Sequence, residues 1–230
     1  MEAQASFRVV ANHAFIDLPS TTIEGYQLSS GIYVAPKPAS HQGIEESAAV
    51  IGTVVGAPED LHMQKLVGEE NGQPVYERIP IDISEGDKVA VDYRVVAHGT
   101  WEGETFCHKN CYAIEGRMLW KAEADSLIAV LRDGHWWQAL GDYALLKKAK
   151  RQKYQSSIII IPDSAKEEEE KNIAVHVSGL DVPKGAKVFF QPQFATPYQF
   201  ESGEEMLVIR KDYVFGVIDD SEAFTYQPIA

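Results

Sequence analysis

The sequence has 230 residues, 45% hydrophobic side chains and a formal net charge of −13. This length accommodates one large domain or two of about 100 residues each, with enough apolar side chains for packed cores. The excess of acidic residues argues against a nucleic acid or an anionic membrane as partner, because either would require a basic face. The two cysteines, Cys107 and Cys111, are too few for a disulfide framework.

The N-terminal residues carry no targeting signal that we recognise. The first ten residues contain one arginine and no apolar run of the length found in signal peptides. No stretch of about 18 uncharged apolar residues occurs anywhere in the sequence. We therefore expect a soluble protein of the cytoplasm.

Apolar residues fall in short runs rich in Val, Ile, Tyr and Phe, separated by Gly, Pro, Asn or Asp. Such runs are typical of many short strands, and no long segment has sustained helical periodicity. Clear examples are residues 51–55, 88–96, 127–131, 143–146, 187–190 and 206–209. The pattern predicts an all-β protein, built as a barrel or a sandwich.

A series of segments occurs twice, in the same order, along the chain. Each copy has an alternating first strand, an aliphatic triplet followed by proline, a short strand ending in glycine, a glycine turn that leads into a strand, and two closing strands. The segments are 11–18, 29–36, 51–56, 83–89 and 118–131 in the first copy, and 139–146, 156–162, 173–179, 182–188 and 206–218 in the second. Five ordered matches indicate two diverged copies of one domain.

The two copies differ in length at two places. Residues 57–82 have no counterpart in the second copy, and their Asn71-Gly72 pair is typical of a β-hairpin turn. Residues 101–116 are expected to form an inserted loop, and a turn-like break at residues 132–135 separates the copies. The predicted parts of the chain are two domains and a tail, at residues 6–133, 134–220 and 221–230.

The second copy resembles the GroES-type co-chaperonin family. Residues 140–147 resemble the opening strand of that family, and residues 157–165, which read Ser-Ile-Ile-Ile-Ile-Pro-Asp-Ser-Ala, resemble its mobile loop. Residues 182–190 resemble its V-x-x-G-D-x-V strand, and residues 204–218 resemble its closing hairpin. The first copy is similar at fewer positions, and its residues 57–82 lie where the family has a roof hairpin.

The resemblance implies two tandem, partly open β-barrels of the GroES type. It implies a co-chaperonin, with no catalysis and no cofactor, that forms a homo-oligomer and caps the folding cavity of a GroEL-type chaperonin. The partner-binding residues would be the aliphatic triplets, Ile32, Tyr33, Val34, Ile159, Ile160 and Ile161. Family members form seven-domain rings, so a two-domain chain leaves three arrangements open: seven chains with stacked domains, a ring of one domain type, or no ring.

Other interpretations of these residues remain open. The triplets also fit the pattern of a buried core strand. Cys107, His108 and Cys111 have side chains that bind zinc, but their spacing is not a usual knuckle and no second ligand pair follows, so we expect no metal site. The charged run at residues 166–171 is most simply a solvent-exposed loop.

Two other classes of function contrast with the co-chaperonin. Medium-chain dehydrogenases contain a GroES-like domain, but they also need a dinucleotide-binding unit with a G-x-G-x-x-G motif, which this sequence lacks. It also lacks G-x-S-x-G, H-E-x-x-H and P-loop motifs, so we expect no enzyme. The alternative is a diverged GroES-like structural or interaction module that does not bind a chaperonin.

Overall fold

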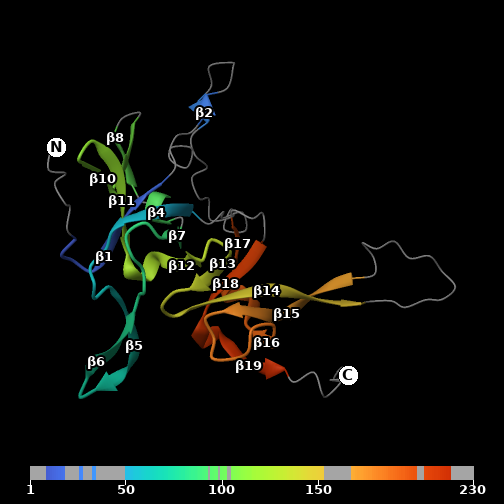
Figure 1. Ribbon diagram of the computed structural model, residues 1–230. Helices are drawn as coiled ribbons and strands as arrows, with labels where there is room; N and C mark the ends of the chain where they lie inside the picture. Colours follow the sequence, from blue (N-terminus) through green and yellow to red (C-terminus); the bar gives the residue numbers. More distant parts are fainter. Residues whose placement is uncertain are drawn as a thin grey trace.

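The computed structural model describes residues 9–18, 26–27, 33–34, 50–92, 94–97, 99–102, 105–152, 167–200 and 205–218. These residues form mostly β-structure, with one N-terminal and one C-terminal antiparallel sheet (Figure 1). This arrangement confirms the predicted all-β class and is consistent with two GroES-like units. The helical elements of this part are short: α1 (Arg94–Ala97), η3 (Ala124–Ser126), η4 (Pro192–Phe194) and η5 (Lys211–Tyr213). In the same residues no helix has the length and apolarity needed to cross a membrane.

The N-terminal sheet has seven strands in the order β10-β11-β1-β4-β7-β12-β13, each antiparallel to its neighbours. Their bounds are β1 (His13–Asp17), β4 (Val50–Gly56), β7 (Lys88–Val91), β10 (Cys111–Ile114), β11 (Arg117–Glu123), β12 (Leu127–Arg132) and β13 (Trp136–Ala139). The strand β4 shows why such segments form sheets. Its residues alternate between buried and half-buried positions, and Val50 and Val54 lie in the core.

The C-terminal sheet has six strands in the order β17-β18-β14-β15-β16-β19. Their bounds are β14 (Tyr143–Gln152), β15 (Glu167–Ser178), β16 (Lys187–Phe190), β17 (Thr196–Gln199), β18 (Glu205–Arg210) and β19 (Val214–Ile218). Two-stranded ribbons lie outside both sheets: β2 (Tyr26–Gln27) with β3 (Tyr33–Val34), β5 (His62–Glu70) with β6 (Gln73–Pro80), and β8 (Gly99–Glu102) with β9 (Thr105–His108). The segment 101–116, expected to be a loop, therefore contributes to β8 and β9 and contains β10.

The two sheets repeat one arrangement of strands. Five neighbouring strands of the N-terminal sheet have the order β11-β1-β4-β7-β12, and the C-terminal order β18-β14-β15-β16-β19 has the same connectivity. A 3-10 turn joins the last two strands in each half, η3 in the first and η5 in the second. The sequence matches outside the loops thus fall on equivalent strands of the two sheets.

The strand β13 joins the two halves. It follows β12 after a tight turn at Asp133 and Gly134, which both have positive φ, 53° and 69°. It then pairs with β12, and Trp137 lies opposite Leu131. By position in the sequence β13 belongs to the second predicted domain, but by hydrogen bonding it belongs to the first sheet. The boundary predicted between residues 133 and 134 lies within this turn and stays a prediction.

One hydrophobic core extends across both halves. Trp137 is 5% exposed, and its ring centroid lies 4.9 Å from that of Phe200, whereas Trp136 is 39% exposed. The second half contributes to this shared core Leu140, Tyr143, Leu145, Tyr198, Phe200, Met206 and Val208. Separating the halves would expose these side chains to water, so the two sheets form one packed body.

An ionic contact ties the β5–β6 ribbon to the second half. Lys65 Nζ lies 2.9 Å from Asp142 Oδ1 and 2.6 Å from Asp212 Oδ1. The backbone N–H of Asp142 donates to Met63 Sδ at 3.2 Å. Next to it, Gly141 has a φ of 56°, and a Cβ at this position would meet Met63 at 2.8 Å. The close approach of ribbon and turn therefore favours glycine at position 141.

Replacing Lys65 with Met should lower the free energy of unfolding by about 1–3 kcal/mol, because the Asp142 carboxylate would lose its cationic partner while its side chain stays only 8% exposed. Urea unfolding measures this loss. Lys109 is exposed in the turn between β9 and β10, so Lys109→Met is the matched control and should change stability little. Equal losses in the two variants would contradict the prediction.

The same contact has a defined pH dependence. Hydrogen bonds to Asp212 and, to a lesser extent, Asp142 raise the pKa of the Lys65 ammonium. A lysine with a raised folded-state pKa contributes its full stabilisation below the unfolded pKa, about 10.4, and loses it as the pH rises through the folded value. The stability difference between wild type and Lys65→Met should therefore stay constant from about pH 7 to 9 and shrink above about pH 10.5. A decrease already complete by pH 9 would contradict this assignment.

Candidate partner-binding loops

The two candidate loops leave equivalent corners of the two sheets. The first loop connects β1 to β4, which are antiparallel neighbours with Asp17 opposite Thr53. The second connects β14 to β15, with Gln152 opposite Glu167 at the last described pair. Antiparallel pairing thus holds the two ends of each loop side by side, so each loop leaves its sheet and returns to it at the same place.

All six predicted contact residues fall in these loops. Tyr33 and Val34 form β3, whose Val34 lies opposite Tyr26 of β2, and this ribbon belongs to neither large sheet. The side chains of Tyr33 and Val34 lie outside the described residues, as do Ile32, Ile159, Ile160 and Ile161. Their role in partner binding therefore stays a prediction.

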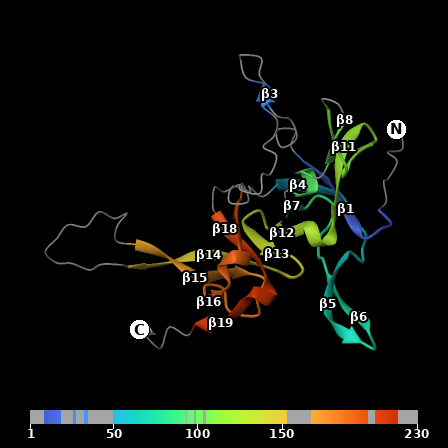
Figure 2. The ribbon, with the colours of Figure 1, turned by 180° about the vertical axis from the view of Figure 1, so that it is seen from behind.

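The second loop is carried on a long two-stranded stem. The strands β14 and β15 have 10 and 12 residues. Within the sheet, β14 pairs with β18 as far as Leu146, and β15 pairs with β16 from Ile173 to Val175. Farther out, β14 and β15 pair only with each other, to Gln152 opposite Glu167. Figures 1 and 2 show this stem leaving the sheet on the side away from the N-terminal sheet.

The charged run at residues 166–171 is not the solvent-exposed loop that we expected, because its residues from Glu167 onward form part of β15. In the ladder Glu169 lies opposite Lys150, and Glu168 lies opposite Arg151. The signal in the sequence was a basic run before the loop that mirrors an acidic run after it. The acidic run by itself does not indicate that it pairs with the basic run of β14.

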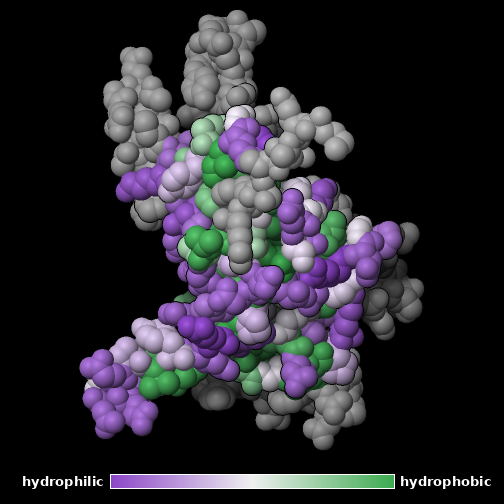
Figure 3. Space-filling model, turned by 60° about the vertical axis from the view of Figure 1, so that its left-hand side comes forward, coloured by the Kyte–Doolittle hydropathy of each residue, from purple (hydrophilic) through white to green (hydrophobic). Residues whose placement is uncertain are grey.

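The β5–β6 ribbon is a second projecting feature. It turns at Asn71 and Gly72, which have φ values of 54° and 76°, as this residue pair favours. Leu66 and Tyr76 lie opposite each other on the two strands and are 59% and 53% exposed. Figure 3 shows apolar surface on the projecting ribbon behind a hydrophilic tip. Exposed apolar side chains gathered on one projecting element indicate a contact surface.

Of Cys107, His108 and Cys111, the side chains of His108 and Cys111 are described, and His108 makes other contacts in the fold. His108 Nδ1 lies 2.9 Å from the carbonyl oxygen of Val96, and its ring packs edge-on against Trp120 at 4.8 Å. Burial raises the pKa of the half-buried Cys111 thiol, which disfavours the thiolate that binds metals. The side chain of Cys107 lies outside the described residues. Among those that are described, no three His, Cys, Asp or Glu residues gather as metal ligands.

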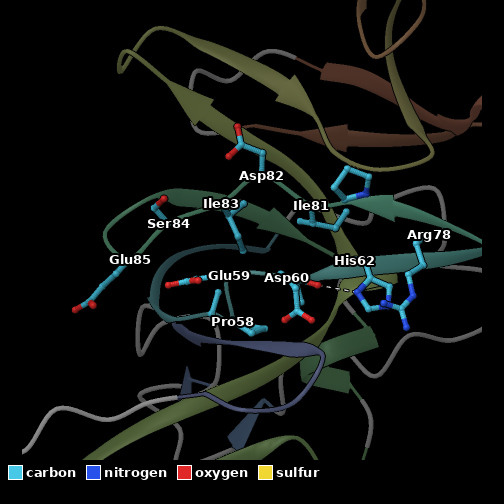
Figure 4. A pocket seen from close by; sticks show the side chains of 13 residues that line it. Pro58, Glu59, Asp60, His62, Arg78, Ile81, Asp82, Ile83, Ser84 and Glu85 are labelled. Carbon is cyan, nitrogen blue, oxygen red and sulfur yellow. Dashed lines mark hydrogen bonds between the residues drawn. The ribbon is translucent and has the colours of Figure 1, made fainter.

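An open cavity of about 700 Å³ lies at the base of the β5–β6 ribbon (Figure 4). His62 Nδ1 lies 2.7 Å from the carbonyl oxygen of Asp60, and Asp82 is paired with Arg132 at 2.9 Å. Figure 4 shows the acidic side chains spread around the cavity rather than converging. Acid–base or metal chemistry needs converging groups, so this cavity does not fit a catalytic site.

Comparison with known proteins identifies the second half. The Co-chaperonin GroES of Hyphomonas neptunium is 30% identical over 91 residues, which cover 35% of this chain and 94% of that protein. The GroES of Clostridium acetobutylicum is also 30% identical over 91 residues, covering 35% of this chain and 95% of that protein. The GroES of Campylobacter jejuni subsp. doylei is 33% identical over 84 residues, covering 36% and 96%.

The family model described as chaperonin 10 Kd subunit matches residues 137–218, which extend from β13 to the end of β19. The relatives are named co-chaperonins, not enzymes, and about one third of this chain spans nearly the whole of each. Through residues 137–218, the chain therefore belongs to the chaperonin 10 family.

Proposed function

We propose that this protein is a co-chaperonin that caps the folding cavity of a GroEL-type chaperonin in the cytoplasm. The observation that carries the proposal is the chaperonin 10 match at residues 137–218, which includes the β14–β15 stem and the loop between its strands. We assign Ile159, Ile160 and Ile161 of this loop as its contacts with the chaperonin. The resemblance of residues 157–165 to the family's mobile loop supports this assignment.

We extend the proposal to the first half, as a second GroES-like unit in tandem. The repeated strand order supports this extension, because β11-β1-β4-β7-β12 has the connectivity of β18-β14-β15-β16-β19. The first loop occupies the position in its sheet that the second loop occupies in its own. Its residues Ile32, Tyr33 and Val34 are then the corresponding contacts.

Binding by such loops follows from ordinary physical chemistry. Burying one large aliphatic side chain contributes roughly 1.5–3 kcal/mol, and ordering a loop costs part of that gain. A single loop therefore binds weakly, and several loops in one assembly supply the avidity needed for a stable cap. In this proposal the protein catalyses no reaction and requires no cofactor.

We propose that the assembly is a head-to-tail homo-oligomer. In this chain β13 covers the outer edge of β12, the closing strand of the first unit. The counterpart of β12 in the second half is β19, which is the outermost strand of the C-terminal sheet in the described residues. Phe215 and Val217 of β19 are 59% and 52% exposed. By its place in the repeated order, the segment before β1 corresponds to β13, and we propose that in a second copy it pairs with this open edge.

Replacing Ile160 with Asp should weaken chaperonin binding by at least about tenfold, because burying a charge in the proposed contact of Ile160 carries a large desolvation cost. We would measure native mass by light scattering on a sizing column, with a GroEL-type chaperonin and with or without ATP. The matched control is Met118→Asp, which puts the same charge at an exposed position of β11 and should leave binding unchanged. The wild type should co-elute with the chaperonin only when nucleotide is present.

Limited proteolysis and chaperonin binding together separate the proposal from its alternative. Residues 20–46 and 151–171 should be protease-sensitive in the free protein and protected in the complex. Absence of chaperonin binding by the wild-type protein in every nucleotide state would overturn the co-chaperonin proposal. It would support a GroES-like structural or interaction module.

The double variant Phe215→Lys and Val217→Lys should reduce the native mass to that of one chain, because charged side chains on an edge strand oppose pairing. Wild-type protein should have the mass of several chains under the same conditions. Tyr112→Lys with Met118→Lys serves as control, since it adds the same charge to exposed apolar positions of β10 and β11. Persistence of the multi-chain mass in the β19 variant would exclude this edge as the interface.

A further inference from the structure

A second cavity, of about 420 Å³, is lined by residues of both halves of the molecule. The first half contributes the end of β12, the turn at Gly134 and β13 as far as Trp137. The second half contributes β14, β15, β18 and the turn that leads into β16. Small-molecule sites have volumes of roughly 300–1,000 Å³, so this cavity has the size of a ligand site. A molecule held in it contacts both halves.

The lining of this cavity differs in charge from the rest of the protein. Its apolar wall consists of Leu131, Trp136, Trp137, Val175, Val177 and Met206. Two lysines, Lys147 and Lys184, also line it, and none of the described residues around it is Asp or Glu. The chain has 34 acidic and 21 basic residues, and the cavity at the base of the β5–β6 ribbon is lined by four acidic side chains. A cavity with cations and without acids therefore stands out in this molecule.

The Lys184 ammonium is held at this cavity by an aromatic ring. Its Nζ lies 5.8 Å from the ring centroid of Trp136, and an ammonium is attracted to an indole face within about 6 Å. None of the ion pairs between described residues involves Lys184. The side chain is exposed, so the ammonium lies on the side of the cavity that faces solvent. Its charge can therefore pair with an anionic group of a ligand.

A buried histidine fixes the turn that carries Lys184. His176 is 4% exposed, and the backbone N–H of Leu180 donates to its Nε2 at 3.2 Å. Its Nδ1 therefore carries the ring hydrogen, which is donated to the carbonyl oxygen of Pro183 at 3.2 Å. The backbone N–H of Gly185 donates to the carbonyl oxygen of His176 at 2.9 Å. Because the turn is already ordered, little conformational entropy is lost when a ligand binds beside it.

The opposite wall is fixed by packing between the two halves. Trp137 is 5% exposed, and its ring centroid lies 4.9 Å from that of Phe200. Trp136 is 39% exposed, so its ring borders the cavity and also reaches solvent. Apolar side chains bind the apolar part of a ligand by removing it from water. The wall and the ammonium together favour a molecule that is apolar at one end and anionic at the other.

We infer that this cavity binds a small organic carboxylate with an apolar body. The carboxylate pairs with the Lys184 ammonium, and the apolar body packs on Trp136, Trp137 and the side chains of β15 and β18. Part of the lining, from Leu131 to Trp136, precedes the chaperonin 10 match at residues 137–218. The matched region alone therefore does not form this site. The inference does not depend on the proposed co-chaperonin function.

Three probes with the same apolar body and different charges test the site: phenylbutyrate, phenylbutanol and phenylbutylamine. The whole chain is labelled with fluorotryptophan, and binding is followed by the fluorine resonances of Trp136 and Trp137. Phenylbutyrate should shift both resonances saturably, with a Kd on the order of a millimolar. It should bind about threefold or more tighter than the alcohol, and the amine should bind most weakly. The resonance of Trp120, which is fully buried in the first sheet, should not move.

Substitutions of Lys184 test the charge preference. Lys184→Glu should weaken phenylbutyrate binding by about tenfold and should make phenylbutylamine the tightest of the three probes. Lys184→Met should bring phenylbutyrate to the affinity of the alcohol. Lys184 is exposed in a turn, so both variants should keep the unfolding midpoint of the wild type. The matched control is Lys109→Glu, which makes the same change in net charge at an exposed position and should leave all three affinities unchanged.

The outcomes that contradict the inference are distinct. Absence of saturable shifts at Trp136 and Trp137 with every probe would overturn the site itself. Equal affinities of the three probes for the wild type, or an unchanged order of affinities in Lys184→Glu, would overturn the assignment of a carboxylate. None of these measurements includes a chaperonin, so their results are separate from those that test the proposed function.

Discussion

The pairing of β13 with β12 is the interaction on which the rest of the arrangement depends. It turns the chain back at Asp133-Gly134 and commits the opening segment of the second half to the sheet of the first. The same strand then buries Trp137 against Phe200 of the second half. One strand thus hydrogen-bonds to one sheet and packs on the other, so the two sheets cannot shift without breaking both contacts. The approach of Gly141 to Met63 is possible only because β13 fixes where the next strand begins.

Much of this fold could be predicted from the sequence because similar segments occur twice in the same order along the chain. The ordered matches located the equivalent strands of both sheets, and the Asn71-Gly72 pair located a turn. The sheet that β13 joins could not be predicted, since a strand's own residues do not specify its hydrogen-bonding partner. The β8–β9 ribbon was missed for another reason. A ribbon outside the main sheets has little need of the apolar alternation by which strands are recognised.

The two segments that occur in the same order located the candidate loops. They did not reveal which charged residues lie opposite each other on the strands that lead into the second loop. The relation between Lys150 and Glu169 spans a loop, so it becomes visible only once the register of β14 and β15 is known. His108 is of a residue type that suggests metal chemistry, although its spacing with the two cysteines predicts no metal site. Its ring packs against Trp120 and its Nδ1 meets a backbone carbonyl, which accounts for it as part of the structure.

The covalent connection through β12 and β13 also has an evolutionary consequence. In an assembly of identical single-domain subunits, a substitution in one loop appears at every position at once. In this chain the two loops are encoded separately but are present in equal number, because each polypeptide carries one of each. The sequences show that they have diverged, with Tyr33 at the centre of one triplet and Ile160 at the centre of the other. Under the proposed function, selection can therefore tune the contacts of one loop while those of the other are held constant.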